Sequence, residues 1–200
     1  MLVSGIKSRP VYPGLRITRG AQRHLFAIEG EGALAVLELI PPGDPVLGHV
    51  EILYVAAGSA GSGHADRLAA LGAADYWQAP TVPTLINRLA AMLSTATMST
   101  RLYAAGTEPF IGAVVRAAAD YGIKHSSIMR EHRGSLKRRV QCVHCKGFTE
   151  DVTTSPVQCA HCGLHLIVRD HFSRRFNAFQ GVCANAEEPG LLPPPEELFA

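Results

Sequence analysis

Two Cys-x-x-Cys pairs in the C-terminal part of the chain constrain its fold more than any other feature of the sequence. The first pair is Cys142-Val-His-Cys145, and the second is Cys159-Ala-His-Cys162, followed by Gly163. Each pair places two thiolates on one tight turn, and two such turns facing each other supply the four ligands of a tetrahedral site. We therefore predict a structural metal site at these four cysteines, with zinc as the expected ion.

Two alternatives to zinc remain for these cysteines. They could form two redox-active pairs, or they could hold rubredoxin-type iron, which accepts the same four sulfur ligands. The short spacing over residues 146–158 argues against iron. Four protein ligands leave zinc no open position, so its expected role is to fold a segment whose apolar core is small. We expect His144 and His161 to face solvent and Cys183 to be a buried or bystander thiol rather than a nucleophile.

Charge and hydropathy limit the classes of function. The net charge is only +2, which does not by itself imply a nucleic-acid or membrane partner. No apolar run approaches the roughly 20 residues of a membrane helix, and the N-terminus lacks the apolar centre of a signal peptide. We expect a cytoplasmic protein with reduced thiols. Basic neighbours should favour the thiolate form of the cysteines; they are Lys137, Arg138, Arg139, Lys146 and Arg169.

The sequence before the cysteines alternates between two patterns. Strand-like runs occupy residues 23–30, 49–58, 75–80, 100–106 and 125–132, and helix-like runs occupy residues 33–40, 64–73, 84–93 and 108–122. Strands separated by helices predict βαβ units and a parallel sheet, and continuously apolar strands predict that both faces of the sheet are covered. The expected domains are an irregular arm (1–20), an α/β domain (21–134), a zinc ribbon (135–186) and an acidic, Pro-rich tail (187–200) that is either an extended strap or disordered.

The α/β region resembles the NAD-binding domain of ferredoxin reductases over roughly residues 23–132. The likeness rests on Leu102-Tyr-Ala-Ala-Gly106-Thr-Glu-Pro-Phe110, on Gly122, and on Glu131-His132 at the end of the last strand. Glu29-Gly-Glu-Gly-Ala-Leu-Ala35 stands where that family has its Gly-rich loop. The resemblance implies a Rossmann-like fold, with a cofactor site at Gly30, Gly32, Gly106 and Thr107.

Several residues depart from the reductase pattern. Ala105-Gly106-Thr107 replaces Cys-Gly-Pro, and Leu34-Ala35 replaces Thr-Pro. Glu29 and Glu31 put negative charge where a pyrophosphate would lie, which repels it. A second Gly-rich stretch at 58–63 is either an anion cradle at a helix start or a flexible connection. We therefore expect a vestigial cofactor site and no hydride transfer.

The C-terminal region resembles a more particular family, the DmmA-like accessory subunits of bacterial dimethylamine monooxygenase. The likeness rests on Cys159-Ala-His-Cys162-Gly163, on Val168-Arg-Asp-His-Phe-Ser-Arg-Arg175, and on Ala178-Phe-Gln-Gly-Val182. It implies a multi-subunit, NADPH-dependent haem monooxygenase that converts dimethylamine to methylamine and formaldehyde. Haem then belongs to a catalytic subunit, and FMN and a 2Fe-2S cluster belong to a reductase subunit.

The resemblance makes this chain an accessory subunit without catalytic residues of its own. We expect Arg169, Arg174 and Arg175 either to meet an acidic partner surface or to form an ordinary solvated edge. Phe172, Phe176 and Phe179 follow helical spacing, and this stripe packs either on its own domain or on a partner.

Two other functions stay open. A zinc-ribbon nucleic-acid binder would use the basic run from Arg130 to Arg139. A stand-alone NAD(P)H oxidoreductase would use the α/β domain.

Overall fold

The computed structural model describes residues 8–58 and 62–200, which form two compact units. One unit comprises residues 12–134, and the other comprises residues 8–11 with 135–200. Among the described residues, no helix is long and apolar enough to cross a membrane. The predicted Gly-rich stretch at 58–63 includes residues 59–61, which lie outside the described residues, as does the start of the expected arm.

The first unit, the α/β unit, alternates strands and helices along the chain. Its elements are β1 (Arg23–Glu29), α1 (Gly32–Leu39), η1 (Pro45–His49), β2 (Val50–Val55), α2 (His64–Ala69), β3 (Asp75–Ala79), α3 (Val82–Leu93), β4 (Thr100–Gly106), α4 (Glu108–Ala119), η2 (His125–Ser127) and β5 (Ile128–His132).

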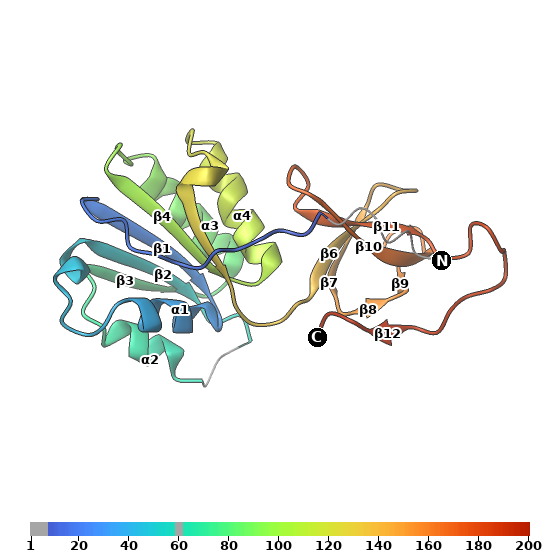
Figure 1. The fold of residues 1–200 in the computed structure, drawn as a ribbon, viewed down its shortest axis with the longest axis horizontal. Helices are drawn as coiled ribbons and strands as arrows, with labels where there is room; N and C mark the ends of the chain where they lie inside the picture. The colour runs from blue at the N-terminus through green and yellow to red at the C-terminus, as the bar shows by residue number, and fades with distance from the viewer. Residues whose placement is uncertain (1–7, 59–61) are drawn as a thin grey trace. The chain divides into compact units, whose positions relative to one another are not determined.

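All five strands are parallel, and their order in the sheet is β3-β2-β1-β4-β5. Helices α1 and α2 cover one face of the sheet, and α3 and α4 cover the other (Figure 1). The strands are apolar on both faces because each face packs against helices, as expected for a buried parallel sheet. The predicted α/β fold class is therefore confirmed.

Local signals in the sequence explain where the helices begin. The Thr81 side chain accepts a hydrogen bond from the amide of Thr84, and Pro83 lies in the first turn of α3. Leu85, Leu89 and Leu93 then form the buried stripe of that helix.

Two predicted strands are longer than the observed ones by several residues. The strand predicted over 49–58 ends at Val55, because Ala57 and Gly58 have positive φ angles of 41° and 94° and turn the chain out of the sheet. The strand predicted over 125–132 begins only at Ile128. The polar residues His125–Ser127 form a 3-10 turn instead.

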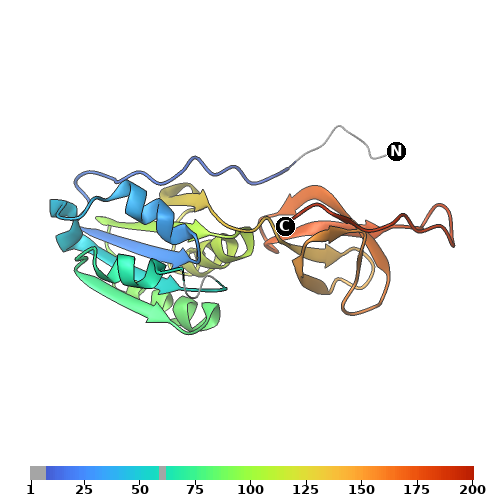
Figure 2. The ribbon, with the colours of Figure 1, turned by 90° about the horizontal axis from the view of Figure 1, so that it is seen from below.

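Residues 12–18 of the arm contain no helix or strand, yet they are anchored to the α/β unit (Figure 2). Leu15 is buried in the hydrophobic cluster on the α1 side of the sheet. The Leu15 amide donates to the Glu131 carboxylate at 2.8 Å, and the Thr18 amide donates to the Tyr103 hydroxyl at 3.1 Å. The Tyr103 hydroxyl also lies 2.9 Å from Nδ1 of buried His24, so the arm is tied to the centre of the sheet.

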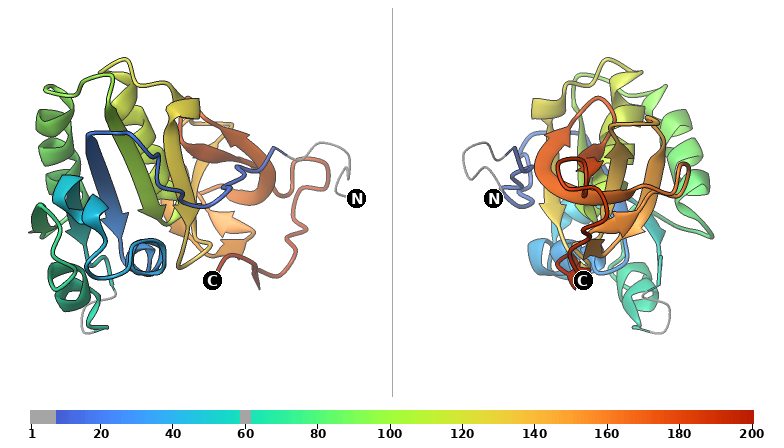
Figure 3. Two further views of the ribbon diagram at one scale, coloured as in Figure 1. Left: turned by 60° about the vertical axis from the view of Figure 1, so that its left-hand side comes forward. Right: turned by 90° about the vertical axis from the view of Figure 1, so that its right-hand side faces the viewer.

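The second unit, the ribbon unit, is built of short strands. They are β6 (Arg138–Cys142), β7 (Phe148–Val152), β8 (Thr154–Ser155), β9 (Val157–Gln158), β10 (His165–Ser173), β11 (Ala178–Cys183) and β12 (Glu196–Glu197). The main sheet has the order β7-β6-β11-β10-β9, and β12 pairs with β8 in a separate two-stranded sheet (Figure 3).

The tail returns to the ribbon unit as an extended strap, one of the two expected forms. The amides of Leu198 and Phe199 both donate to the carbonyl oxygen of Thr153 at 2.9 Å. Phe199 is buried, and the Arg138 guanidinium lies between its ring and that of Phe179, 3.9 and 4.0 Å from the two centroids. The buried guanidinium is thus stabilised in two ways, by the two aromatic rings and by its ion pair with Asp170 at 2.8 Å.

Gly32, the first residue of α1, lies directly against the end of β4. A Cβ atom at Gly32 would lie 2.2 Å from the carbonyl oxygen of Ala105, whereas a Cβ atom at Gly48 would meet nothing within 4 Å. We therefore expect Gly32→Ala to lower the free energy of unfolding by about 3 kcal/mol or more, because backbone must move. Gly48→Ala should change it by less than about 0.5 kcal/mol. Thermal and chemical unfolding of the two variants measure both effects, and equal stability of the two would contradict the predicted close packing.

Candidate metal centre and cofactor crevice

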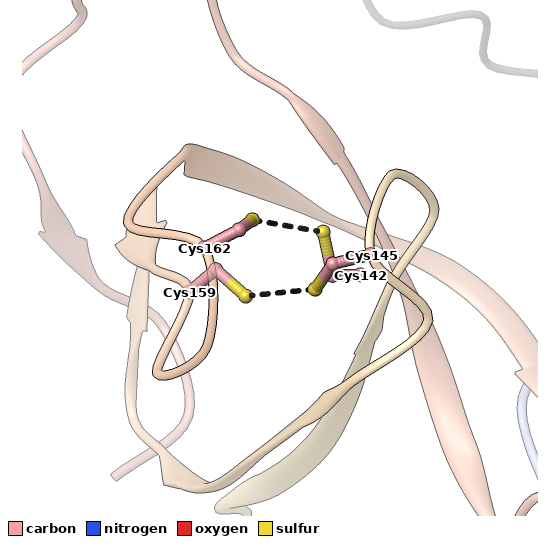
Figure 4. Close-up of side chains that lie close together, drawn as sticks. All are labelled: Cys142, Cys145, Cys159 and Cys162. Carbon is pink, nitrogen blue, oxygen red and sulfur yellow. Dashed lines mark hydrogen bonds between the residues drawn. The ribbon is translucent and has the colours of Figure 1, made fainter.

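The four predicted cysteine ligands come together at one point of the ribbon unit (Figure 4). The sulfur atoms of Cys142 and Cys162 are 3.8 Å apart, those of Cys145 and Cys159 are 3.7 Å apart, and all four lie within 4.8 Å of one another. A tetrahedron with metal–sulfur bonds of about 2.3 Å has edges of about 3.8 Å. The geometry therefore fits a metal ion bound by four thiolates.

Both turns that carry the cysteines are built in the same way. After each pair the chain takes a left-handed residue, Lys146 with φ 64° and Gly163 with φ 73°. The amide of Lys146 donates to the carbonyl of Cys142 at 3.0 Å, and the amide of Gly163 donates to that of Cys159 at 3.1 Å. These bonds close each loop and direct both sulfur atoms of a pair to the same side.

Backbone amides and neighbouring sulfurs set the protonation of the second pair. Burial alone would raise the pKa of Cys159, but hydrogen bonds from the amides of Cys162 and His161 lower it to about 6. The amide of Leu164 favours the thiolate of Cys162, yet partial desolvation and the three neighbouring sulfurs raise its pKa to about 12. Four thiolates this close together would repel one another, and a divalent ion bound among them would supply the balancing charge.

Other residues around the cluster are not its ligands. His144 and His161 are exposed, as predicted, and His161 Nε2 donates to the Phe148 carbonyl oxygen at 3.0 Å. Cys183 lies outside the cluster, and its thiol donates to the side chain of Asn185 at 3.2 Å.

The basic residues near the cysteines serve a different purpose from the expected one. Instead of stabilising thiolates, Lys137 pairs with Asp151 at 2.6 Å and Arg139 pairs with Glu150 at 3.0 Å. Arg138 pairs with Asp170. At Cys159 and Cys162, backbone hydrogen bonds favour the thiolate, and no lysine or arginine is among the causes of the pKa shifts.

The predicted helical stripe of aromatic residues is wrong. Phe172 lies on β10 and Phe179 on β11, where they are cross-strand partners with ring centroids 5.0 Å apart. Phe176 lies in the turn between the two strands and is exposed. The spacing of four and three residues matches a helix by coincidence, because the turn of the hairpin falls inside the motif.

The strand order of the α/β unit reverses between β1 and β4. We call the carboxyl ends of these two strands the crevice position, because related folds have their cofactor crevice there. In folds of this type, dinucleotides bind at the carboxyl ends of these strands, against helix N-termini. The predicted cofactor residues do meet there. Gly30 and Gly32 follow β1, while Gly106 ends β4 and Thr107 is the N-cap of α4.

A carboxylate of the chain itself lies at this position. Buried Glu29 accepts hydrogen bonds from the Thr107 amide at 2.9 Å and from the Thr107 hydroxyl at 2.5 Å. A Cβ atom at Gly106 would lie 2.8 Å from the Cβ of Glu29, so the two strand ends are in direct contact. Negative charge at the start of α4 is favourable there, and an anionic ligand would have to displace it.

The arm adds a second carboxylate contact that sequence reasoning missed. The Tyr12 hydroxyl donates to the carboxylate of Glu108, which is buried in the first turn of α4, and Arg130 lies 5.5 Å from the centroid of the Tyr12 ring. Burial, and then the charge of Glu108, raise the pKa of Tyr12 well above its usual value, so the phenol keeps its proton. The acidic residue at the helix start was the only sequence signal for this contact.

Arg133 makes further polar contacts at these strand ends. The Arg133 guanidinium binds Glu131 at 2.7 Å and Glu38 at 2.6 Å, and the Arg133 amide donates to the Gly106 carbonyl at 3.0 Å. The polar groups at the strand ends are thus bonded to one another.

The fold and the cysteine cluster together define a class of protein, in which a Rossmann-like α/β unit accompanies a four-cysteine ribbon. Family models described as "Dimethylamine monooxygenase subunit DmmA-like" match both parts, the N-terminal domain over residues 4–128 and the C-terminal domain over residues 139–182. The chain belongs to this DmmA-like family, as its sequence motifs predict.

A curated relative supports the same assignment. The heme-dependent oxidative N-demethylase delta subunit of Ectopseudomonas mendocina (strain ymp) is 32% identical over 187 residues, which cover 91% of each chain. The chain is therefore homologous to a subunit of an oxidative N-demethylase.

Solved structures similar to this chain include two reductases. The ferredoxin reductase in carbazole 1,9a-dioxygenase (17% identity, TM-score 0.37) matches over 58% of this chain and 34% of its own. Phthalate dioxygenase reductase (11% identity, TM-score 0.42) matches over 71% of this chain and 46% of its own. The chain thus spans less than half the length of either structure, and the family assignment rests on the sequence matches.

For the metal centre we expect Cys145→Ser to lower the bound metal from one equivalent to well below half. The ribbon unit beyond about residue 135 should then become sensitive to protease, because its apolar core is too small to hold it alone. Metal analysis by mass spectrometry and limited proteolysis measure the two effects, and the α/β unit should survive as a resistant fragment.

The matched control is Cys183→Ser, which removes a thiol outside the cluster. This variant should keep its metal and its protease resistance. If Cys145→Ser behaves like the control, the four cysteines do not form a structural metal site.

Proposed function

We propose that this chain is an accessory, non-catalytic subunit of a haem-dependent oxidative N-demethylase that acts on dimethylamine. The complete enzyme would use dioxygen and two electrons from NADPH to convert dimethylamine to methylamine and formaldehyde, with water as the other product. Family membership and the delta-subunit relative support the assembly. The observation that carries the accessory role is the hydrogen-bonded contact of Glu29 with Thr107 in the crevice.

The contact matters because of where it lies. A dinucleotide would place its pyrophosphate against helix N-termini at the carboxyl ends of β1 and β4. There the chain presents Glu29 and Glu108, both buried and both hydrogen-bonded to other side chains. A bound phosphate would meet two negative charges and would have to break these bonds. We therefore interpret Gly30, Gly32, Gly106 and Thr107 as a vestigial site.

The other cofactors of the proposed enzyme would belong to its other subunits. If the four clustered cysteines hold a metal ion, Cys183 is the only thiol left, and a 2Fe-2S cluster needs four protein ligands. We assign the 2Fe-2S cluster to a reductase subunit on this ground, and we assign FMN to the same subunit and haem to a catalytic subunit because the family resemblance implies it. Both subunits are proposed partners of this chain.

Zinc is the proposed ion of the ribbon unit. Four thiolates at tetrahedral spacing make a closed site, the usual arrangement of structural zinc. Its role would be to hold the two cysteine-bearing turns together, with no open position for substrate. Iron would fit the same four sulfurs, and metal analysis together with the visible absorption of the native protein separates the two.

The nucleic-acid alternative is weakened by the ion pairs of its basic run. Arg133, Lys137, Arg138 and Arg139 each bind a carboxylate of the chain. Charges neutralised in this way are not available to phosphates, so their contribution to nucleic-acid affinity would be small. Filter binding at low salt tests this alternative.

The assembly itself can be tested by affinity purification of this chain, carrying a tag, from its native host. We expect a haem protein and a flavin and iron–sulfur reductase to co-purify in fixed ratios, and dimethylamine-dependent oxygen uptake to accompany them. Purification of the chain with neither protein would refute the proposed function.

The isolated chain should neither oxidise nor bind NADPH measurably. We expect no turnover with flavin or dye acceptors and no change in the fluorescence of Trp77 on titration with NADPH, because the crevice is filled by carboxylates. The purified reductase subunit serves as the positive control for the assay. Steady turnover by a preparation free of that subunit would overturn the accessory role and favour a stand-alone oxidoreductase.

A further inference from the structure

The hairpin between β10 and β11 presents a defined tip to solvent. Ser173 and Ala178 are cross-strand partners, and residues 174–177 connect them. The Phe176 amide donates to the Ser173 hydroxyl at 3.4 Å, and buried Asn177 adopts a left-handed φ of 49°. The turn is thus closed by a hydrogen bond and a left-handed residue, while Arg174, Arg175 and Phe176 are all exposed.

The strand register shows which residues of the sheet lie on the same face. Phe148 pairs with Gln141, Gln141 with Gln180, and Gln180 with Arg169. Paired residues in neighbouring strands project to the same face, so Phe148 and Arg169 share one face across four strands. The partners Val140 and Phe179 project to the opposite face, into the hydrophobic core.

Aromatic contacts join the tip to this outer face. The rings of Phe176 and Phe148 have centroids 6.3 Å apart, the Arg175 guanidinium lies 5.4 Å from the Phe176 centroid, and the Arg139 guanidinium lies 4.1 Å from that of Phe148. We call the set Phe148, Arg169, Arg174, Arg175 and Phe176 the docking face. Its aromatic pair is partly exposed and is bordered by guanidinium groups.

The arginines of the docking face differ from most other cations of the ribbon unit, of which Lys146 alone among the unit's described lysines and arginines donates to a backbone carbonyl in place of a carboxylate. Arg9, Lys137, Arg138 and Arg139 all form ion pairs with carboxylates of the chain. Within the part of the chain that the structure describes, Arg169, Arg174 and Arg175 form none. Three guanidinium groups thus keep the donors that suit carboxylates.

We infer that the docking face binds an acidic surface of a partner subunit, one whose carboxylates surround a small apolar patch. This inference rests on the proposed function, because it requires a multi-subunit assembly. Aromatic and arginine side chains are enriched at interface centres, and a hairpin turn that is already hydrogen-bonded has less entropy to lose on binding than an unstructured segment. A nucleic acid fits less well, because a sequence-independent phosphate surface needs a longer row of unpaired cations.

The test compares two charge-reversed variants in assembly with the other demethylase subunits. The double variant Arg174→Glu/Arg175→Glu makes the charge of the hairpin tip four units more negative. The control, Arg67→Glu/Arg116→Glu, makes the same change at exposed positions of α2 and α4. We expect the tip variant to raise the dissociation constant at least about tenfold at low ionic strength, and the control to change it less than about twofold. Circular dichroism and metal content should match the native chain in both.

A second pair of variants tests the apolar part of the face. Phe176→Ala removes the exposed ring of the tip, and Tyr121→Ala removes a ring of similar exposure from the α/β unit (39% and 41%). Phe176→Ala should weaken assembly several-fold, because exposed aromatic anchors contribute strongly to interfaces, whereas Tyr121→Ala should not. Binding of the native chain should also weaken as salt rises, because exposed charges are screened.

The outcomes separate this inference from the proposed function. If the native chain assembles and both tip variants assemble equally well, the partner binds elsewhere and the docking face is refuted while the proposed function stands. If the native chain itself does not assemble, the proposed function fails and the inference fails with it. If the tip variants lose affinity for RNA or DNA but assemble normally, the face serves nucleic acid and the inference is wrong.

Discussion

The sulfur atoms of Cys142 and Cys162 lie 3.8 Å apart, and those of Cys145 and Cys159 lie 3.7 Å apart. Thiolates at this spacing repel one another unless a cation lies among them. The two turns that carry them join β6 to β7 and β9 to β10, so the whole sheet depends on how this charge is balanced. A metal ion at this point would cross-link four strands whose shared core contains few large apolar side chains.

Negative charge is also compensated in the α/β unit, but there the chain itself supplies both the carboxylates and their hydrogen-bond donors. Glu29 accepts hydrogen bonds from the amide and hydroxyl of Thr107, and the Tyr12 hydroxyl donates to Glu108 at the start of the same helix. A helix N-terminus that could bind an external anion thus binds the carboxylates of its own protein. A fold of the nucleotide-binding type can in this way keep its architecture while the residues at its crevice position stabilise the protein.

Much of the fold was predictable because it depends on short-range patterns. The βαβ order, the cap at Thr81 and the close cysteine spacing are all read within a few residues, and the structure bears out the strands and helices of the α/β unit. The errors occurred where local patterns are ambiguous. The spacing of Phe172, Phe176 and Phe179 suits a helix as well as a hairpin, and only pairing with β6 and β9 decides between them.

The sequence by itself determined the four cysteine positions and the family, because ligand spacing and motif order are properties of the chain. Tertiary structure alone decided which charges meet. Glu29 contacts Thr107 across 78 positions, Tyr12 contacts Glu108 across 96, and Arg138 contacts Asp170 across 32. No local rule relates residues so far apart, since their proximity depends on strand order. Only the folded chain therefore shows that Glu29 and Glu108 are hydrogen-bonded at the ends of β1 and β4, while the arginines of one hairpin form no ion pair with the described carboxylates.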